Sequence, residues 1–205
     1  MAVEDFLTRM NALADELRAR PQVTLLNYHV PPPATEEDFA EVEGHIGRKL
    51  PEDIKAFYRQ CNGIQLRWVH KDNKEVDHKL WSGFMEGPFD FEEICIEKGL
   101  EGVVNILDIR SVFYRKLPFE TPVLRRRELE EEIFVRGVQV RMDEFLTQFF
   151  CIDVFTCENG CAILPGLNSQ DSTLAFMLWK TQALPMIGFM LTFDKYLDFL
   201  ILKKG

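Results

Sequence analysis

Two short helical segments followed directly by an alternating segment constrain this chain more than any other part of it. Thr35 is a good helix N-cap, and the acidic residues behind it suit a first helical turn, where the helix dipole favours negative charge. Apolar residues at helical spacing predict helices over residues 35–46 and 51–61. In residues 64–68 apolar and polar side chains alternate, as in a half-buried strand. This stretch therefore predicts helices packed against a sheet.

Glycine and proline residues predict where these two helices begin and end, and one phenylalanine predicts which side faces the core. Gly47 is predicted to end the first helix and Asn62-Gly63 the second, in left-handed conformations that glycine adopts without strain. Pro51 is predicted to occupy the first helical position of the second helix, where its missing N–H costs nothing. Phe57 lies at the centre of that helix's apolar stripe, so we predict that it belongs to the core.

The flanking regions extend this pattern to an α+β fold. Apolar stripes predict an extra N-terminal helix within residues 1–20, over 3–20, and a last helix over 192–201. Segments rich in strand formers predict strands, which are residues 24–28, 103–107, 149–155, 161–164, 173–179 and 186–191. We therefore expect a single domain over residues 1–205, with helices packed on a largely antiparallel sheet.

The charge and composition of the whole chain argue against several classes of function. A net charge of −9 and a pI near 5.0 disfavour nucleic-acid binding, because phosphate contacts require a basic face. No apolar run reaches the roughly 18 residues that a membrane span needs. The first residues lack the features of a secretory signal, and five cysteines, an odd number, fit reduced thiols better than a disulfide framework. We expect a cytoplasmic protein that binds neither nucleic acid nor membrane.

The search for catalytic or metal-ligating spacing yields two weak candidates. Cys151, Cys157 and Cys161 fall on a predicted hairpin, but no fourth cysteine or histidine lies nearby, and buried free cysteines are the commoner explanation. His70 and His78 flank a polar turn, where ordinary loop residues are the simpler interpretation. We therefore expect no catalytic residue, no cofactor and no metal site, and hence no enzyme.

One acidic and aromatic segment is a candidate surface for a basic protein partner. Residues 86–108 contain seven acidic residues and one basic residue, Lys98. Acidic residues steer a basic partner and aromatic rings anchor it, although the same rings could instead point into the core. The candidate residues are Trp81, Phe84, Glu86, Phe89, Asp90, Glu92, Glu93 and Glu97. The acidic face of the 35–46 helix, with Glu36, Glu37 and Glu41, is the second candidate surface.

The order of these local features resembles the SUKH superfamily, which includes the fungal cell-wall-synthesis regulators of the Smi/Knr type. The resembling residues are 34–39, 46–55, 57–58, 62–63 and, in the last helix, 192–200. They supply an acidic-capped helix, a Leu50-Pro51 start, an aromatic pair and an Asn-Gly end. Residues 69–148 depart from the family pattern, and we expect insertions there relative to shorter members.

The resemblance implies helices packed against a largely antiparallel sheet, and a function in binding. Bacterial members of the superfamily are commonly immunity proteins, which bind a toxin domain, often a nuclease, and block it. The superfamily is not known for a shared catalytic site. We therefore expect a toxin-neutralising immunity protein with a basic toxin domain as its partner. The alternative is a Smi/Knr-like regulatory or scaffold adaptor that binds several signalling partners. The oligomeric state is left open.

Overall fold

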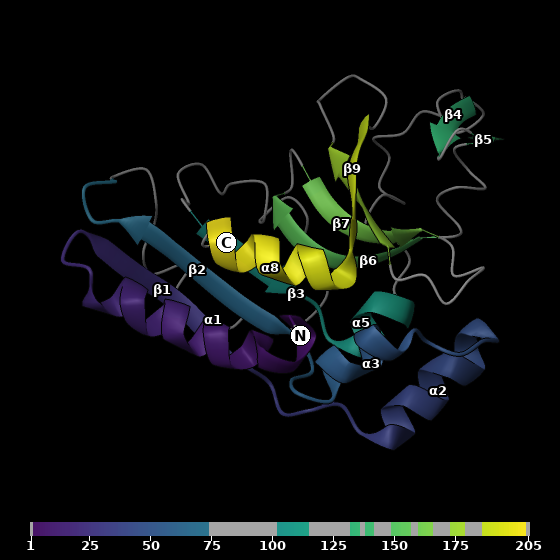
Figure 1. Cartoon of the computed structure of the whole chain (residues 1–205), viewed down its shortest axis with the longest axis horizontal. Coiled ribbons are helices and arrows are strands. Elements are labelled where there is room, and N and C mark those ends of the chain that lie inside the picture. Colours follow the sequence, from purple (N-terminus) through teal and green to yellow (C-terminus); the bar gives the residue numbers. More distant parts are fainter. Residues whose placement is uncertain are drawn as a thin grey trace.

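A computed structural model shows a long antiparallel sheet with helices on one face (Figure 1). It describes residues 2–73, 102–114, 132–135, 138–141, 149–156, 160–165, 173–178 and 186–203. The helices are α1 (Ala2–Ala19), α2 (Glu36–Ile46), α3 (Glu52–Tyr58), α5 (Ile109–Tyr114) and α8 (Phe193–Lys203). The strands of the long sheet are β1 (Val23–His29), β2 (Ile64–His70), β3 (Gly102–Ile106), β6 (Phe149–Thr156), β7 (Gly160–Pro165), β8 (Thr173–Leu178) and β9 (Met186–Thr192).

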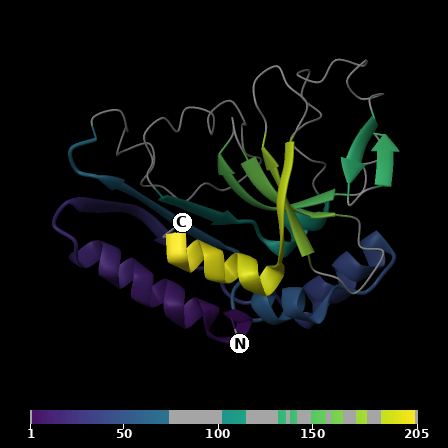
Figure 2. The same cartoon turned by 45° about the horizontal axis from the view of Figure 1, so that its top comes forward.

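The long sheet has the strand order β1-β2-β3-β6-β7-β8-β9, and every neighbouring pair is antiparallel. A separate two-stranded sheet pairs β4 (Glu132–Val135) with β5 (Val138–Arg141). Helix α1 contacts β1, α3 and α8, while α5 contacts α2 and β6. Figure 2 shows α1 and α8 together beneath the sheet. The predicted α+β fold with a largely antiparallel sheet is confirmed.

Both ends of α3 differ from the predicted ones, while the other predicted helices shift by one or two residues. Helix α3 ends at Tyr58, because the N–H groups of Gln60 and Cys61 both donate to the Phe57 carbonyl and close a tight turn. Asn62 then donates to the Pro32 carbonyl, which takes the chain out of the helical path. Pro51 lies at the N-cap instead of the first helical position, because its backbone is extended, with ψ at 141°. Helix α5 and the β4–β5 pair were not predicted.

Asn62 and Gly63 fix the junction between α3, β3 and α5. Gly63 has a φ of 100°, and a Cβ at this position would lie 2.7 Å from the carbonyl oxygen of Ile106. The position therefore requires glycine, as predicted, although it lies beyond the helix end. The side-chain oxygen of Asn62 accepts a hydrogen bond of 2.9 Å from the N–H of Ile109. This contact orients the first turn of α5.

The centre of the core lies where α1, α3 and α8 meet. Phe57 is fully buried, as predicted, and its ring lies 5.7 Å from that of Phe6 and 5.5 Å from that of Phe193. The ring of Tyr58 lies 5.0 Å away, edge-on, and its hydroxyl donates to the carbonyl oxygen of Leu107. Aromatic rings from three separate helices thus hold the helical layer together.

The long sheet has two parts, β1-β2-β3 and β6-β7-β8-β9, which are joined by a short pairing between β3 and β6. We call this junction the seam. Strands β3 and β6 share one paired position, Ile106 with Asp153. The buried carboxylate of Asp153 accepts hydrogen bonds from the N–H of Asn105, at 3.0 Å, and from the hydroxyl of Tyr196 in α8. Because a buried carboxylate is stable only when its oxygens are hydrogen-bonded, these contacts hold β3, β6 and α8 in one arrangement.

Candidate protein-binding surface

The two candidate surfaces predicted from the sequence fall in different parts of the chain. All eight candidate residues of the first surface, from Trp81 to Glu97, lie outside the described residues, so that surface stays a prediction. Glu36, Glu37 and Glu41 of the second surface all lie exposed on α2. The structure brings this face of α2 together with side chains of α3 and α5. We call the resulting surface the α2–α5 ridge, composed of Glu36, Glu37, Asp38, Glu41, His45, Glu52, Arg59, Arg110 and Tyr114.

The start of α2 is fixed by a reciprocal cap. The hydroxyl of Thr35 accepts a hydrogen bond of 3.1 Å from the N–H of Asp38, and the Asp38 carboxylate accepts one of 2.8 Å from the N–H of Thr35. These contacts with Thr35 lower the pKa of Asp38. Phe39 and Val42 are buried on the opposite face of the helix. The acidic face of α2 is therefore held toward solvent by the packing of its apolar face.

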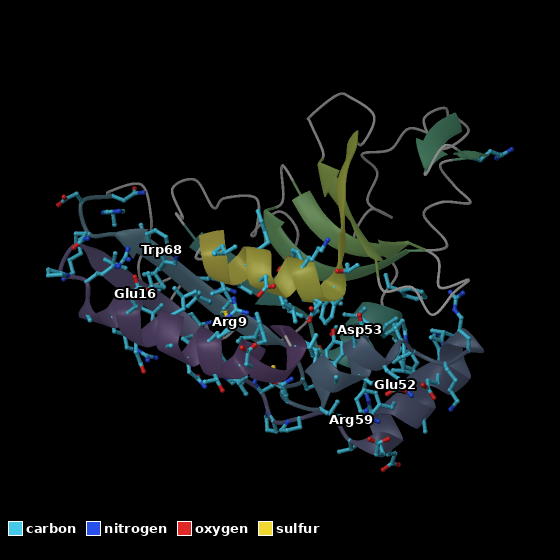
Figure 3. The ribbon with its side chains drawn as sticks, in the orientation of Figure 1. Arg9, Glu16, Glu52, Asp53, Arg59 and Trp68 are labelled. Carbon is cyan, nitrogen blue, oxygen red and sulfur yellow. The ribbon has the colours of Figure 1, made fainter. Side chains whose placement is uncertain are left out.

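Two arginines partly neutralise the ridge. The Arg59 Nε atom lies 2.9 Å from a carboxylate oxygen of Glu36, and Figure 3 shows Arg59 close to Glu52 on α3. The Arg110 guanidinium lies 2.7 Å from Glu41 and 3.1 Å from Asp38. Exposed ion pairs contribute little to stability, so their main effect here is to orient side chains. Five carboxylates face two guanidiniums and the ammonium of Lys55, which lies 3.4 Å from Glu52 and is shared with Glu43, and Glu37 has no ion pair with a described residue. The ridge therefore keeps a negative charge.

An exposed aromatic pair lies beside these carboxylates. The Tyr114 ring stacks on His45, with the ring centroids 4.2 Å apart and an interplanar angle of 23°. Tyr114 is nevertheless 40% exposed. Its hydroxyl donates to Glu41, whose carboxylate oxygen lies 3.1 Å away. Partial desolvation and this hydrogen bond raise the pKa of the Tyr114 hydroxyl, so it stays protonated and remains a donor.

No local sequence pattern indicates this part of the ridge. Arg110 and Tyr114 belong to α5, whose six residues are too few for a helical repeat to be recognised. They reach Glu41 across separations of 69 and 73 residues along the chain. Only the tertiary fold brings them together.

Behind the ridge, Glu43 fastens α2 to α3. Its carboxylate, only 7% exposed, lies 2.6 Å from the Lys49 ammonium and 2.7 Å from that of Lys55. It also accepts a hydrogen bond of 3.0 Å from the N–H of Leu50. Burial alone would raise the pKa of Glu43, but the hydrogen bonds from the two lysines and from Leu50 outweigh burial and lower it to about 2. Glu43 therefore stays charged at neutral pH.

Protonation of Glu43 should weaken the fold in acid. A carboxylate whose pKa falls on folding stabilises the folded state above its unfolded pKa, here 4.5, and loses that effect as the pH falls toward 2. We expect Glu43→Gln to reduce the free energy of unfolding at pH 7 by roughly 2 kcal/mol, allowing for solvent screening at the exposed Lys49. The difference in stability between the variant and the wild type should shrink steadily as the pH falls from 4.5 toward 2. Urea denaturation at pH 7, 4 and 2.5 measures this, and parallel pH profiles would contradict it.

The candidates for chemistry find no further support in the described residues. Cys151 lies in β6 and Cys161 in β7, but Cys151 pairs with Ile163 and not with Cys161, while Cys157 lies outside the described residues. His70 ends β2, and His78 is also outside them. Within the described ranges, no group of three or more potential metal ligands occurs.

Two further findings concern the described helices and the buried thiol. None of these helices combines the length and the apolar character that crossing a membrane requires. Burial raises the pKa of the Cys61 thiol to about 12, which keeps it protonated and a poor nucleophile.

Comparison with known proteins identifies a matching family. The sequence model of the SMI1 / KNR4 family (SUKH-1) matches residues 33–163, more than half of the chain. The match includes α2, α3 and α5, and hence the whole α2–α5 ridge, whereas α1 and α8 lie outside it. No curated protein matches the chain. The resemblance seen in residues 34–63 is confirmed.

Proposed function

Because this chain belongs to the SMI1 / KNR4 family (SUKH-1), we propose that it acts by binding another protein, as an immunity protein that neutralises a bacterial toxin domain. The protein would work in the cytoplasm and in a one-to-one complex, by covering or locking the active site of the toxin. Such a mechanism needs no reactive group of its own, so the proposed function is not enzymatic.

The α2–α5 ridge is the observation that supports this proposal. It combines a surplus of carboxylates with an exposed, stacked aromatic pair, and charged groups steer a partner while aromatic rings anchor it. With a net charge of −9, the chain suits a basic partner. The buried polar groups described above serve the fold itself: Glu43 joins α2 to α3, and Asp153 joins the strands at the seam.

The predicted segment from Trp81 to Glu97 is kept as a second part of the proposed interface. It lies within the residues matched to the family, and its acidic and aromatic composition suits the same kind of basic partner.

Protection of a bacterial host tests the proposed function. Each candidate toxin domain from the reading frames beside this gene is expressed in that host with and without this chain. We expect the chain to restore growth and to form a one-to-one complex with the purified toxin domain in light scattering. A toxin of the same class from an unrelated gene cluster, which should not be neutralised, is the control.

Absence of both protection and a complex would contradict the immunity function. If the chain instead bound several proteins weakly, without protecting the host, the adaptor function would replace it, because an adaptor trades affinity for a range of partners.

A further inference from the structure

Tyr114 is the feature of the ridge that a solvated acidic face does not explain. Among the described residues, the large hydrophobic side chains that lie exposed are Tyr114, Phe199 and Leu202, and of these only Tyr114 lies on the α2–α5 ridge. Aromatic rings are usually buried or used in contacts, because their exposure leaves a large apolar area in water. An exposed ring beside carboxylates is therefore a candidate binding anchor.

The contacts of Tyr114 hold its ring in place before any partner arrives. One side of the ring stacks on His45, and the hydroxyl is hydrogen-bonded to Glu41. Glu41 is in turn paired with Arg110, which also contacts Asp38. Because these side chains are already ordered, a partner that binds here loses little conformational entropy in fixing them.

We propose that the α2–α5 ridge docks a lysine- or arginine-bearing loop of the partner protein, with Tyr114 as its anchor. The cation lies against the Tyr114 ring beside the carboxylate of Glu41, and the exposed carboxylate of Glu37, one helical turn earlier on α2, adds negative charge. This assignment rests on the proposed function and identifies the chemistry of the partner. An acidic loop would meet repulsion from the same carboxylates, so charge complementarity selects a basic one.

A basic peptide tests the docking surface without knowledge of the partner. The probe is an acetylated and amidated heptapeptide in which two lysines and two arginines alternate with glycines, titrated into the isotope-labelled full chain and followed by NMR. We expect the largest amide shifts in α2 and α5, and smaller ones in α1, which also carries exposed acids but lies away from the ridge (Figure 1). Shifts spread evenly over the acidic surface would overturn the proposal.

Five variants separate the anchor from general charge. Tyr114→Ala and Glu37→Gln should each weaken peptide binding, whereas Leu202→Ala and Asp15→Asn, matched changes on exposed side chains of α8 and α1, should leave it unchanged. Tyr114→Phe keeps the ring and should stay within about twofold of the wild type, because the anchor is the ring face. Equal binding by Tyr114→Ala and the wild type would overturn the proposal. Unchanged melting temperatures confirm that each variant is folded.

Kinetics with the neutralised toxin domain complete the test. We expect Tyr114→Ala to speed dissociation about tenfold or more, because anchors act mainly on the dissociation rate. Glu37→Gln should slow association and reduce its salt dependence.

If the wild type protects the host but both variants match it, this inference fails and the immunity function stands. An effect of replacing Asp90, Glu92 and Glu93 with alanine would then place the interface in the predicted segment. If the peptide maps to the ridge but no toxin is neutralised, the immunity function fails.

Discussion

A chain lacking residues 1–20 should fail to fold, although these residues lie outside the part matched to the family. Helix α1 supplies one side of the core, and its buried apolar side chains are Val3, Phe6, Met10, Leu13, Ala14 and Leu17. Burial of a large apolar side chain contributes about 1.5–3 kcal/mol, so the five larger ones together contribute on the order of 10 kcal/mol. That is similar to the whole stability of an ordinary domain, about 5–15 kcal/mol.

The shortened chain would also lose the stabilising polar contacts that α1 makes. The N–H of Val3 donates to Asp194, Arg9 pairs with Asp198, and the side-chain amide of Gln60 donates to the Val3 carbonyl. Circular dichroism and proton–nitrogen NMR of the shortened chain measure the outcome, and we expect no dispersed spectrum. The matched control replaces Thr8 and Asp15, exposed residues of the same helix, with alanine and should fold normally. A native-like spectrum of the shortened chain would mean that α1 is dispensable and that the predicted single domain over residues 1–205 is wrong.

Phe57→Ala should reduce the free energy of unfolding by about 3–5 kcal/mol, the usual cost of truncating a large core side chain. Phe57 touches rings from α1 and α8, so its loss leaves a cavity between three helices that cannot easily close. Urea denaturation at pH 7 measures the change. Phe57→Leu, which leaves a smaller cavity, should cost clearly less. Equal stability of the alanine variant and the wild type would show that the helical layer repacks around the site.

The sequence predicted the elements whose signals are local. Thr35 and Gly47 delimit α2 because a cap needs only the residues of one turn, and the structure confirms both. The strands that follow from apolar runs and turn residues are also present, with small differences at their ends. Gly63 has the positive φ that was predicted, but it does not end the helix, and the physical reason for a glycine there is the close approach of the Ile106 carbonyl, which lies far along the chain.

What the sequence could not predict depends on contacts between distant segments. Glu36, Glu37 and Glu41 were found because they share one helix face, whereas Arg110 and Tyr114 come from a helix too short to recognise. The pairing that limits the charge of the acidic face was therefore missed, as was the aromatic stack with His45. The candidate residues from Trp81 to Glu97 stay a prediction, which the interface variants above address.

The contacts between α1 and α8 have a consequence for biosynthesis. Val3 and Asp194, joined by a hydrogen bond, are 191 positions apart, and Phe57 completes its ring cluster only with Phe193. As the chain leaves the ribosome, the apolar face of α1 stays exposed until the residues of α8 have been synthesised. A topology dominated by such long-range contacts folds slowly and exposes partly folded forms to aggregation. We therefore expect the nascent chain to depend on chaperones that hold exposed apolar segments, and to gain its binding surface only after most of its length has been translated.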